Sequence, residues 1–403
     1  MTVALRGSYS SRWCRIGAVP SIALLFLWGA VCTSGCRATG AAASAEPRRE
    51  IFDDVCRKVR VHFYDRSFRG LEWREWVREC RERVTAATTD RQLQSILNEL
   101  LARLDASHTG VYTPRDPVFW ALQSVFSHRI DGAPFRQIGA WFVEIDGQWF
   151  VRDVFEGSEA ERSGLKVGDA IAGVGRDRLP FEPVRSFAEA ETVSLWIRRH
   201  RGDAEFPVEV RPALESVQRS HLRAMRKSRR VIQHDGVNVG YVHLWSGTHE
   251  QFQRELALSA DHFQRHADAM ILDLRGGFGG AHPEFIEPFF NGRFTKPLFV
   301  LIDRGSRSGK EWIAHLLRKK RATLIGTRTQ GAFLAGRWFT IVPGRFSLFL
   351  AVAEWPKELD LEGKGVPPHV EVPVPLPYRA GDDPVLRRAL EIAAGDERDV
   401  RRF

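Results

Sequence analysis

The segment Asp303–Glu311 (DRGSRSGKE) delivers two serines to the point where an apolar strand gives way to a helix. A helix start offers free backbone amides and the positive end of the helix dipole, and both stabilise an oxyanion. A serine at such a position is suited to attack a carbonyl carbon once a base removes its proton. The segment therefore favours nucleophilic catalysis by a serine.

A second strand end carries four glycines, in Asp273–Gly280 (DLRGGFGG). Because glycine lacks a Cβ atom, such a stretch turns sharply and presents bare amides to a ligand. Glycines also make plain tight turns, so the motif alone leaves both interpretations open.

Two other kinds of site are excluded by single residues. A phosphate-binding loop ending at Gly309–Lys310 needs glycine where Arg304 stands and serine or threonine where Glu311 stands. A zinc site at His249–Glu250 needs a second histidine where Gln253 stands. No metal-ligand cluster remains, and we expect Glu311 to interact with the helix dipole or a buried partner.

The two serine- and glycine-bearing segments lie in a region where strands and helices alternate, as in a sheet covered by helices. Ligand sites in such sheets lie where the strands run into loops at their carboxyl ends. The predicted strands are Val237–Leu244, Met270–Leu274, Pro297–Ile302 and Ala322–Gly326, and the predicted helices are Thr248–His266 and Lys310–Lys320.

Apolar residues recur at helical spacing from Glu50 to about Leu104. One stripe consists of Ile51, Val55, Val59 and Phe63, and another of Leu93, Ile96, Leu97, Leu100 and Leu101. The turn-forming segment Asp105–Tyr112 (DASHTGVY) then interrupts the pattern, so we expect non-helical structure there.

Short alternating strands are predicted between Phe135 and Pro212. They are Trp141–Ile145, Trp149–Val154, Ala170–Val174 and Val193–Arg198. Among them, Gly157–Ile171 (GSEAERSGLKVGDAI) predicts a short helix followed by a turn, in an order that resembles a PDZ domain. The resemblance implies that a peptide C-terminus is added as a strand at a carboxylate-binding loop and edge formed by Ile138, Gly139, Ala140, Trp141 and Phe142.

A basic segment, Arg219–Arg230, precedes the alternating region and carries six Arg or Lys residues. It lacks the interleaved aromatic residues on which bases could stack. We therefore expect a solvated linker between domains and no nucleic-acid binding.

Taken together, these segments resemble the C-terminal processing peptidases, or tail-specific proteases, a serine peptidase family that includes the tricorn proteases. The resemblance extends from Ile51 to Val374, through a helical cap, a PDZ domain and an α/β core in the family's order. It is strongest in four motifs, which are Leu272–Gly280, Ser306–Glu311, Gly326–Gly331 and Glu362–Pro368.

The resemblance implies roles for individual residues. Ser308 is the nucleophile, and the processing enzymes pair it with a lysine where this chain has Ala332. The tricorn-like branch uses a different base, which implies that His108 is the general base, Ser107 the hydroxyl that orients it and Glu362 the acid that completes the relay. An imidazole that titrates near neutral pH suits this role.

Backbone geometry limits how this relay can form. Neighbouring residues on a strand point to opposite faces, so Ser107 and His108 can cooperate only from a turn or loop. The resemblance further implies an oxyanion hole made by the amide of Gly309 and an amide of Gly276 or Gly277.

At 403 residues, with 43% hydrophobic and 27% charged residues, the chain is long enough for two or three domains and is not of a disordered, collagen-like or coiled-coil class. Part of its formal charge of +9 comes from Arg6, Arg12 and Arg15. This basic start, the apolar run Ile16–Val31 and the small residues that follow predict an export signal. The run is too short to span a bilayer, which needs about 20 residues.

Ser34–Cys36, after the apolar run, resembles a bacterial lipobox, which implies lipidation of Cys36. Ordinary cleavage near Ala41 to Ala45 is the alternative, and both stay open. In either case Cys56 and Cys80 are the cysteines left in the folded part. An exported chain permits a disulfide between them if neighbouring helices bring them together.

The predicted fold class is multidomain α+β, with a PDZ-like β domain and an α/β core of the ClpP or crotonase type. The expected domains are an export signal over 1–35, a helical region over 47–118 that contributes Ser107 and His108, a PDZ-like domain over 135–212, a core over 230–380, and a C-terminal helix and tail over 381–403.

The predicted function is an exported serine endopeptidase, periplasmic or anchored to a membrane by a lipid, that cleaves peptides or protein tails through an acyl-enzyme and needs no metal or cofactor. A non-catalytic PDZ scaffold is the first alternative, favoured by the missing lysine and by Arg307, Gly309 and Lys310 where relatives carry small residues. A hydrolase of small esters or amides is the second. The expected partner is a substrate with a C-terminal tail, and the oligomeric state stays open. A PDZ domain that occludes the site until a ligand binds is a further hypothesis.

Overall fold

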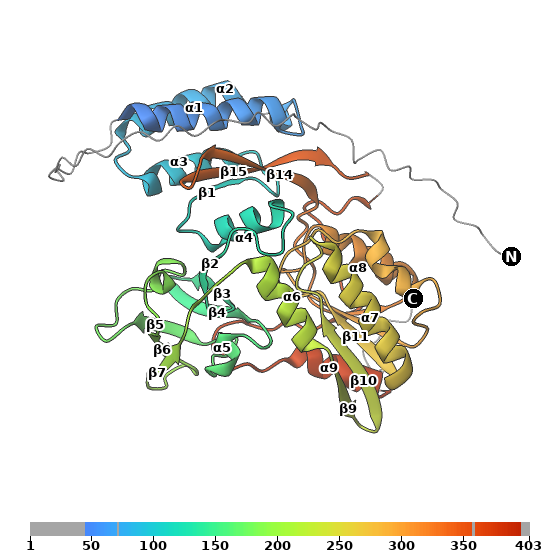
Figure 1. Ribbon diagram of the computed structural model, residues 1–403. Helices are drawn as coiled ribbons and strands as arrows, with labels where there is room; N and C mark the ends of the chain where they lie inside the picture. Colours follow the sequence, from blue (N-terminus) through green and yellow to red (C-terminus); the bar gives the residue numbers. More distant parts are fainter. Residues whose placement is uncertain (1–44, 71, 357–358, 396–403) are drawn as a thin grey trace, which may run out of the picture. The chain divides into compact units, whose positions relative to one another are not determined.

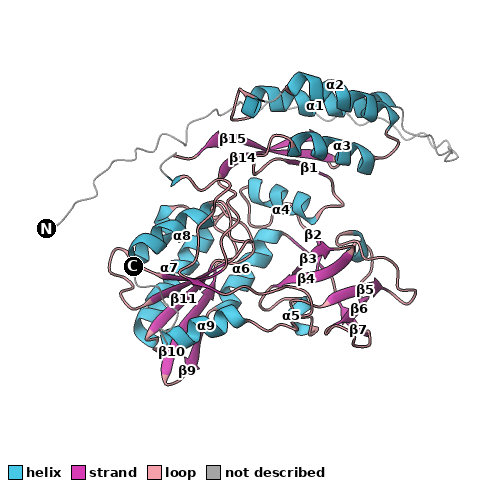
Figure 2. Cartoon of the chain, turned by 180° about the vertical axis from the view of Figure 1, so that it is seen from behind, coloured by secondary structure: helices cyan, strands magenta, loops and turns pink. Residues whose placement is uncertain are grey.

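The computed structural model describes residues 45–70, 72–356 and 359–395, which belong to one compact unit. The predicted export signal over 1–35 and the predicted lipidation site, Cys36, lie outside the described residues. Figures 1 and 2 show the described elements from opposite sides.

Three helices form the N-terminal region: α1 (Ala45–His62), α2 (Trp73–Ala86) and α3 (Asp90–Ala102), with the 3-10 helix η2 (Phe68–Gly70) between the first two. The two predicted apolar stripes face one core, in which Phe52 and Leu97 are fully buried. Helix α2 lies within the predicted helical stretch, although its few buried residues leave only a weak apolar pattern.

The predicted disulfide is not formed. Cys56 on α1 and Cys80 on α2 are both buried free thiols, although the two helices pack together as expected. Burial is the main cause that raises the pKa of Cys56 to about 12, and burial also raises the pKa of Cys80. Both side chains therefore stay protonated and behave as small apolar residues.

A three-stranded sheet joins distant parts of the chain in the order β1 (Gly110–Tyr112), β15 (Phe346–Glu354) and β14 (Leu334–Val342). β1 runs antiparallel to β15, with Gly110 opposite Phe349. Helix α1 packs on both long strands, and α4 (Pro117–Phe126) packs on β14. The turn-forming segment before β1 is thereby fixed against the C-terminal half of the chain.

A five-stranded antiparallel sheet has the order β3-β4-β5-β6-β7. Its strands are β3 (Ala140–Ile145), β4 (Gln148–Val154), β5 (Ala170–Val174), β6 (Val193–Arg198) and β7 (Phe206–Val210). The four predicted strands match β3 to β6 within one residue, and the predicted short helix is α5 (Glu159–Arg162). The flanking elements are β2 (Phe135–Gln137), which pairs with β8 (Ala213–Glu215), and η3 (Arg185–Phe187).

The core is a six-stranded sheet in the order β16-β13-β12-β11-β10-β9, parallel except for β9. Its strands are β9 (Arg230–His234), β10 (Val237–His243), β11 (Ala269–Asp273), β12 (Leu298–Ile302), β13 (Thr323–Gly326) and β16 (Val370–Glu371). One face is covered by α6 (Val217–Ser228), α7 (Glu250–His266), η4 (Pro283–Phe289) and α8 (Gly309–Lys320), and the other by α9 (Pro384–Ala393). The strands and helices predicted here agree within two residues.

The prediction of a solvated linker at Arg219–Arg230 is wrong. Most of this segment belongs to α6, whose apolar face, including Leu222 and Met225, is buried in the core. Its basic residues lie on the outer face, where Arg219 and Arg223 form ion pairs with Asp131 and Glu215. The many charged residues of this segment made its amphipathic helical pattern hard to recognise in the sequence.

None of the helices formed by the described residues combines the length and the apolar character that crossing a membrane requires. Within the same residues, no group of three or more His, Cys, Asp or Glu side chains is arranged to hold a metal ion.

Candidate active site

Ser308 lies at a strained turn between β12 and α8. Its φ of +56° and ψ of −131° are unfavourable for a residue with a Cβ atom. Its N–H lies 3.0 Å from Glu311 Oε2 and 3.0 Å from the Ala332 carbonyl oxygen. Gly279 approaches so closely that a Cβ atom there would lie 2.5 Å from Ser308 Cβ. A serine held in strain at a strand-to-helix turn is typical of hydrolytic nucleophiles.

Glu311 fixes this turn from inside the protein. The carboxylate is fully buried and accepts hydrogen bonds from the Thr329 hydroxyl at 2.6 Å and from the amides of Gly331 and Ala332 at 2.7 and 2.9 Å, in addition to the Ser308 amide. Burial raises its pKa, while these donors oppose the shift. The buried partner expected for Glu311 is therefore a set of one hydroxyl and three amide donors. Through its bond to the Ser308 amide, Glu311 positions Ser308.

Ser107 and Glu362 hold the ring of His108. The Ser107 hydroxyl donates to Glu362 Oε2 at 2.9 Å and lies 2.9 Å from His108 Nδ1, while the Ser107 amide donates to Glu362 Oε1 at 3.0 Å. Because the hydroxyl proton goes to the carboxylate, Nδ1 must carry a proton and donate to Ser107 Oγ. This network assigns the tautomer in which Nε2 has a free lone pair.

The backbone of this relay is a turn, as the two adjacent side chains require. His108 has a φ of +56°, Asp105 has a φ of +44°, and β1 begins two residues after His108. On β14, which pairs with β15, a Cβ atom at Gly336 would lie 2.3 Å from the Phe349 ring and 3.1 Å from His108 Cβ, so the glycine leaves room for both side chains. The sheet of β1, β15 and β14 therefore positions the base.

His108 and Ser308 line the same cavity, which has a volume of about 490 Å³. Among the described residues, no hydrogen bond joins the Ser308 hydroxyl to the His108 ring. Catalytic hydrogen bonds are often long in a free enzyme and tighten when the substrate binds. The structure thus brings together Ser107, His108 and Glu362 by direct contact, and it places Ser308 on the same cavity.

Burial is the main cause that lowers the pKa of His108 to about 4, and the charge of Arg307 lowers it further. The imidazole is therefore neutral at neutral pH, which is the form that can remove a proton from a serine. Tyr112 and Phe349 lie beside the ring in the cavity wall, and the His108 and Phe349 ring centroids are 5.2 Å apart.

The glycines predicted to form the oxyanion hole do not lie together: Gly309 begins α8 beside Ser308, and Gly276 and Gly277 line a different cavity. Gly309 is the first residue of α8, where the amide is free of intrahelical partners. Gly276 and Gly277 instead line a neighbouring cavity, and the Gly276 amide donates to Asp303 Oδ1 at 3.2 Å. The second glycine pair of the motif, Gly279 and Gly280, lies on the Ser308 cavity, so its amides are better placed than those first proposed.

Comparison with known proteins agrees with this site. Residues 288–372 match peptidase family S41, and residues 44–102 match the tricorn protease C1 domain. The chain is therefore similar to this peptidase family in these two segments. The predicted family resemblance and the predicted enzyme class, a serine-type peptidase, are confirmed.

Two curated relatives align with most of this chain. A putative tricorn protease homolog 2 of Streptomyces coelicolor is 24% identical over 86% of the chain, which spans only 32% of that relative. A carboxyl-terminal-processing protease of Synechocystis is also 24% identical, over 88% of each chain.

Solved structures show the same mixed α/β multidomain fold. The photosystem II D1 C-terminal processing protease is 18% identical, with a TM-score of 0.53 over 87% of this chain and 98% of that one. The tricorn protease is 16% identical, with a TM-score of 0.52 over 88% of this chain and 37% of that one. At these identities the likeness concerns the fold alone.

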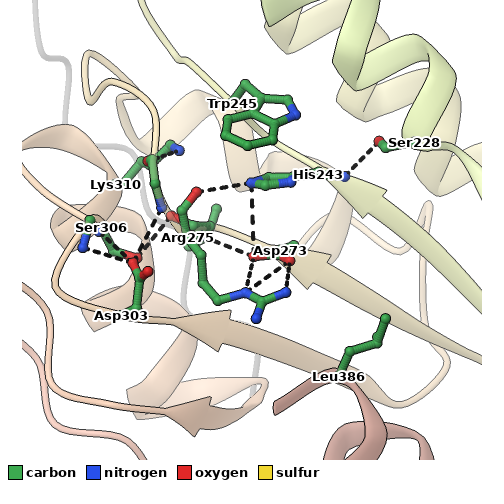
Figure 3. A network of polar contacts seen from close by, with 12 residues as sticks. Ser228, His243, Trp245, Asp273, Arg275, Asp303, Ser306, Lys310 and Leu386 are labelled. Carbon is green, nitrogen blue, oxygen red and sulfur yellow. Dashed lines mark hydrogen bonds and ion pairs between the residues drawn. The ribbon is translucent and has the colours of Figure 1, made fainter. Parts of the chain in front are cut away.

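The protein also buries a lysine two residues after Ser308. Lys310 Nζ donates to the Gly276 carbonyl oxygen at 2.9 Å, and burial is the main cause that lowers its pKa to about 7. Figure 3 shows this side chain beside Asp303, within a polar network at the carboxyl ends of the core strands. Lys310 does not line the cavity of Ser308 and His108, so it does not replace the lysine that is missing at Ala332.

The predicted peptide-binding residues lie on and beside an edge strand. Ile138 and Gly139 line a cavity of about 430 Å³, whereas the apolar part of the edge is closed. β3 is the first strand of its sheet, and the predicted residues Ile138, Ala140, Trp141 and Phe142 line a cavity of only about 10 Å³. Phe142 packs against Phe181 and Phe187, with ring centroids 4.7 and 6.1 Å apart. Gly139 has a φ of +76° and turns the chain into β3, as a binding loop requires.

Two contacts of the candidate site are absent from the sequence-based prediction. The Phe333 amide donates to Glu362 Oε2, and the Gly279 backbone packs against Ser308. The four-glycine motif gives a partial signal for the second contact, because it predicts a close backbone approach but does not indicate which of its two glycine pairs lies beside Ser308. A backbone amide such as that of Phe333 leaves no signal, because every residue except proline has one.

The pH dependence of peptide hydrolysis by this protein should reflect the lowered pKa of His108. A base with a depressed pKa stays neutral to lower pH, so kcat/KM should hold down to about pH 5 and fall with a midpoint near 4 rather than near the ordinary histidine value of 6.5. A profile of kcat/KM from pH 3 to pH 9 tests this, with circular dichroism at each pH as the control for unfolding. A midpoint near 6.5 in folded protein would contradict the expected burial of the base.

Proposed function

We propose that this protein is a serine peptidase of the S41 type that cleaves peptides or protein tails through an acyl-enzyme on Ser308. The observation that carries the proposal is the cavity that Ser308 shares with His108, whose ring is held by Ser107 and Glu362. A hydroxyl and a carboxylate that fix the imidazole tautomer and stabilise the imidazolium serve a nucleophilic serine.

In the proposed mechanism, Ser308 Oγ attacks the scissile carbonyl carbon while His108 Nε2 takes the hydroxyl proton. The carbonyl oxygen becomes an oxyanion, which the amides of Gly309 and of Gly279 or Gly280 would stabilise. His108 then gives its proton to the leaving amine, and the acyl group stays on Ser308. A water molecule, deprotonated by His108, hydrolyses this ester and restores the serine.

The walls of the cavity favour a peptide with apolar side chains. They include Leu122, Phe126, Phe278, Phe349 and Trp355. Two relatives of similar chain length are carboxyl-terminal-processing proteases by name, which supports protein tails as the substrate class. The fixed geometry of a family peptidase site weighs against the non-catalytic scaffold.

We propose further that residues 135–212 form a PDZ-like domain on a ClpP-like core. Strand order, the edge position of β3 and helix α5 support the first part. This domain contacts the core through Glu156, which accepts a hydrogen bond from Trp245 Nε1 at 2.7 Å, and through Gly168, whose carbonyl accepts from the Tyr378 amide at 2.8 Å. Because Phe142 and Phe187 fill the edge, a peptide would have to displace them to bind there.

Export remains a proposal supported by the basic and apolar N-terminal sequence, and a lipid anchor at Cys36 by the motif Ser34–Cys36. Fractionation of cells that produce the full chain and the Cys36→Ala variant would test both. Release of the variant from the membrane fraction is the result expected for a lipid anchor.

The test of the proposed activity is labelling of the purified protein with a serine-directed fluorophosphonate. We expect the wild type to be labelled at a single peptide containing Ser308 and the Ser308→Ala variant to remain unlabelled, since the neighbouring Ser306 hydroxyl is buried and donates to the Leu274 carbonyl at 2.8 Å. Ser306→Ala is therefore a matched control that should retain the label. A folded wild type that takes no label between pH 5 and 9 would refute the proposal.

A further inference from the structure

Arg307 lies directly before the nucleophile and lines both the Ser308 cavity and a second cavity of about 530 Å³. Its guanidinium stands over the ring of Phe278, 5.0 Å from the centroid. An arginine on an aromatic face is held in place while its N–H groups stay available along the edge.

Across the residues that the structure describes, no carboxylate lies within ion-pair distance of the Arg307 guanidinium. The opposite charges that act on it from further away are Asp153 and Glu311. Asp153 forms an ion pair with Arg152 through Oδ2 at 2.8 Å, and Glu311 accepts hydrogen bonds from one hydroxyl and three amides. Each of these two carboxylates therefore has other partners.

The lining of the Ser308 cavity offers no acid either. Of its described lining residues, the ionisable ones that can be positively charged are Arg307, His108 and His128, and none is Asp or Glu. The remaining walls are mostly apolar. A cation that is partly desolvated and unpaired in such a cavity matches a ligand that brings its own carboxylate, because arginine and carboxylate form two parallel hydrogen bonds.

We propose that Arg307 binds a carboxylate of the substrate and makes the peptidase selective for cuts near a negative charge. The proposal rests on the proposed function and names part of its substrate class. Since Arg307 and Ser308 are adjacent, the carboxylate lies within one or two residues of the scissile bond. It comes either from an Asp or Glu side chain of the substrate or from the free C-terminus of a short tail.

Arg307 also lowers the pKa of His108. This effect alone does not explain why the guanidinium lines the cavity. A purely electrostatic influence on the base would change the rate for acidic and neutral substrates alike. Binding of a carboxylate changes the ratio between them. The ratio is therefore the quantity that separates the two functions of this residue.

The experiment uses two matched pairs of fluorogenic peptides, one with Glu or Gln beside the scissile bond and one with a free or an amidated C-terminus. In the wild type we expect kcat/KM to favour the charged member of at least one pair by about 10- to 100-fold. In Arg307→Gln the ratio should fall to about threefold or less, and in Arg307→Lys, which keeps the charge without the planar fork, it should be intermediate.

Arg304→Gln is the matched control, because Arg304 is exposed, lies three residues earlier and lines only the second cavity. It should keep the wild-type ratio. A preference confined to the Glu/Gln pair would assign the carboxylate to a side chain, and one confined to the acid/amide pair would assign it to the C-terminus. Equal rates within both pairs for the wild type, or a preference that survives in Arg307→Gln, would overturn the proposal.

Binding of the same peptides to the Ser308→Ala variant, measured by calorimetry with and without Arg307→Gln, keeps the test independent of turnover. A charged-peptide preference that disappears with Arg307 supports the carboxylate site even if hydrolysis fails. Conversely, fluorophosphonate labelling of Ser308 together with indifferent peptide binding would leave the peptidase in place and remove the carboxylate site.

Discussion

Replacement of His108 by alanine is expected to lower kcat/KM by about 10⁴- to 10⁶-fold, because a serine hydroxyl is a weak nucleophile without a base. Ser308→Ala should cost about as much. Nucleophile and base act as one unit, so the double variant should be less than about tenfold slower than either single variant. The measurement is kcat/KM of the three variants on one peptide substrate.

A second histidine on the same cavity provides the control. His128 lines the cavity but makes no contact with Ser107 or Glu362 among the described residues, so His128→Ala should stay within about tenfold of the wild type. If His128→Ala were as damaging as His108→Ala, or if the losses of His108 and Ser308 were additive, the assignment of the base would be wrong.

Replacement of Glu311 by alanine is expected to lower both activity and stability. The change leaves the Thr329 hydroxyl and the amides of Gly331 and Ala332 buried without an acceptor, and each such group costs about 1–3 kcal/mol. We expect the free energy of unfolding to fall by about 3–5 kcal/mol and kcat/KM to fall by about 10²- to 10³-fold, because a displaced nucleophile loses its attack geometry.

Urea denaturation and peptide kinetics on the same preparation would measure the two effects of Glu311. Glu250→Ala is the matched control, since Glu250 also stands in the first turn of a helix but is exposed and, among the described residues, forms an ion pair only with Arg254, at 2.9 Å. That variant should lose less than about 1 kcal/mol. A Glu311→Ala protein as stable and active as the wild type would show that the turn does not depend on the buried carboxylate.

The core of this protein could be predicted from sequence because its signals are local. Continuous apolar runs predicted the strands β10 to β13, and the spacing of glycines predicted the short helix and turn around α5. The basic segment at α6 was predicted wrongly. Basic residues such as Arg223 and Arg226 dominate its composition, whereas Leu222 and Met225 form its buried face. The sheet of β1, β14 and β15 could not be predicted, since the pairing of Gly110 with Phe349 is a contact across most of the chain.

The site was predictable where family motifs fix the residue types, as at Ser308, and less so where the backbone contributes. Which glycine pair approaches the serine depends on how the loop after β11 turns, and that turn separates Gly276, bonded to Asp303, from Gly279 beside the nucleophile. The prediction of a disulfide was wrong for a related reason. Neighbouring helices bring Cys56 and Cys80 near each other, but this does not determine whether a bond forms between them.

The relay between Ser107 and Glu362 spans 255 residues of sequence. During synthesis the base therefore emerges long before the nucleophile, and the acid that orients it emerges last. β1, too, must wait for β15 before its turn is fixed. Domains of a growing chain fold as they appear, N-terminal first. A half-made copy of this protein consequently lacks part of the proposed hydrolytic centre, which is complete only when the chain has been made as far as Glu362.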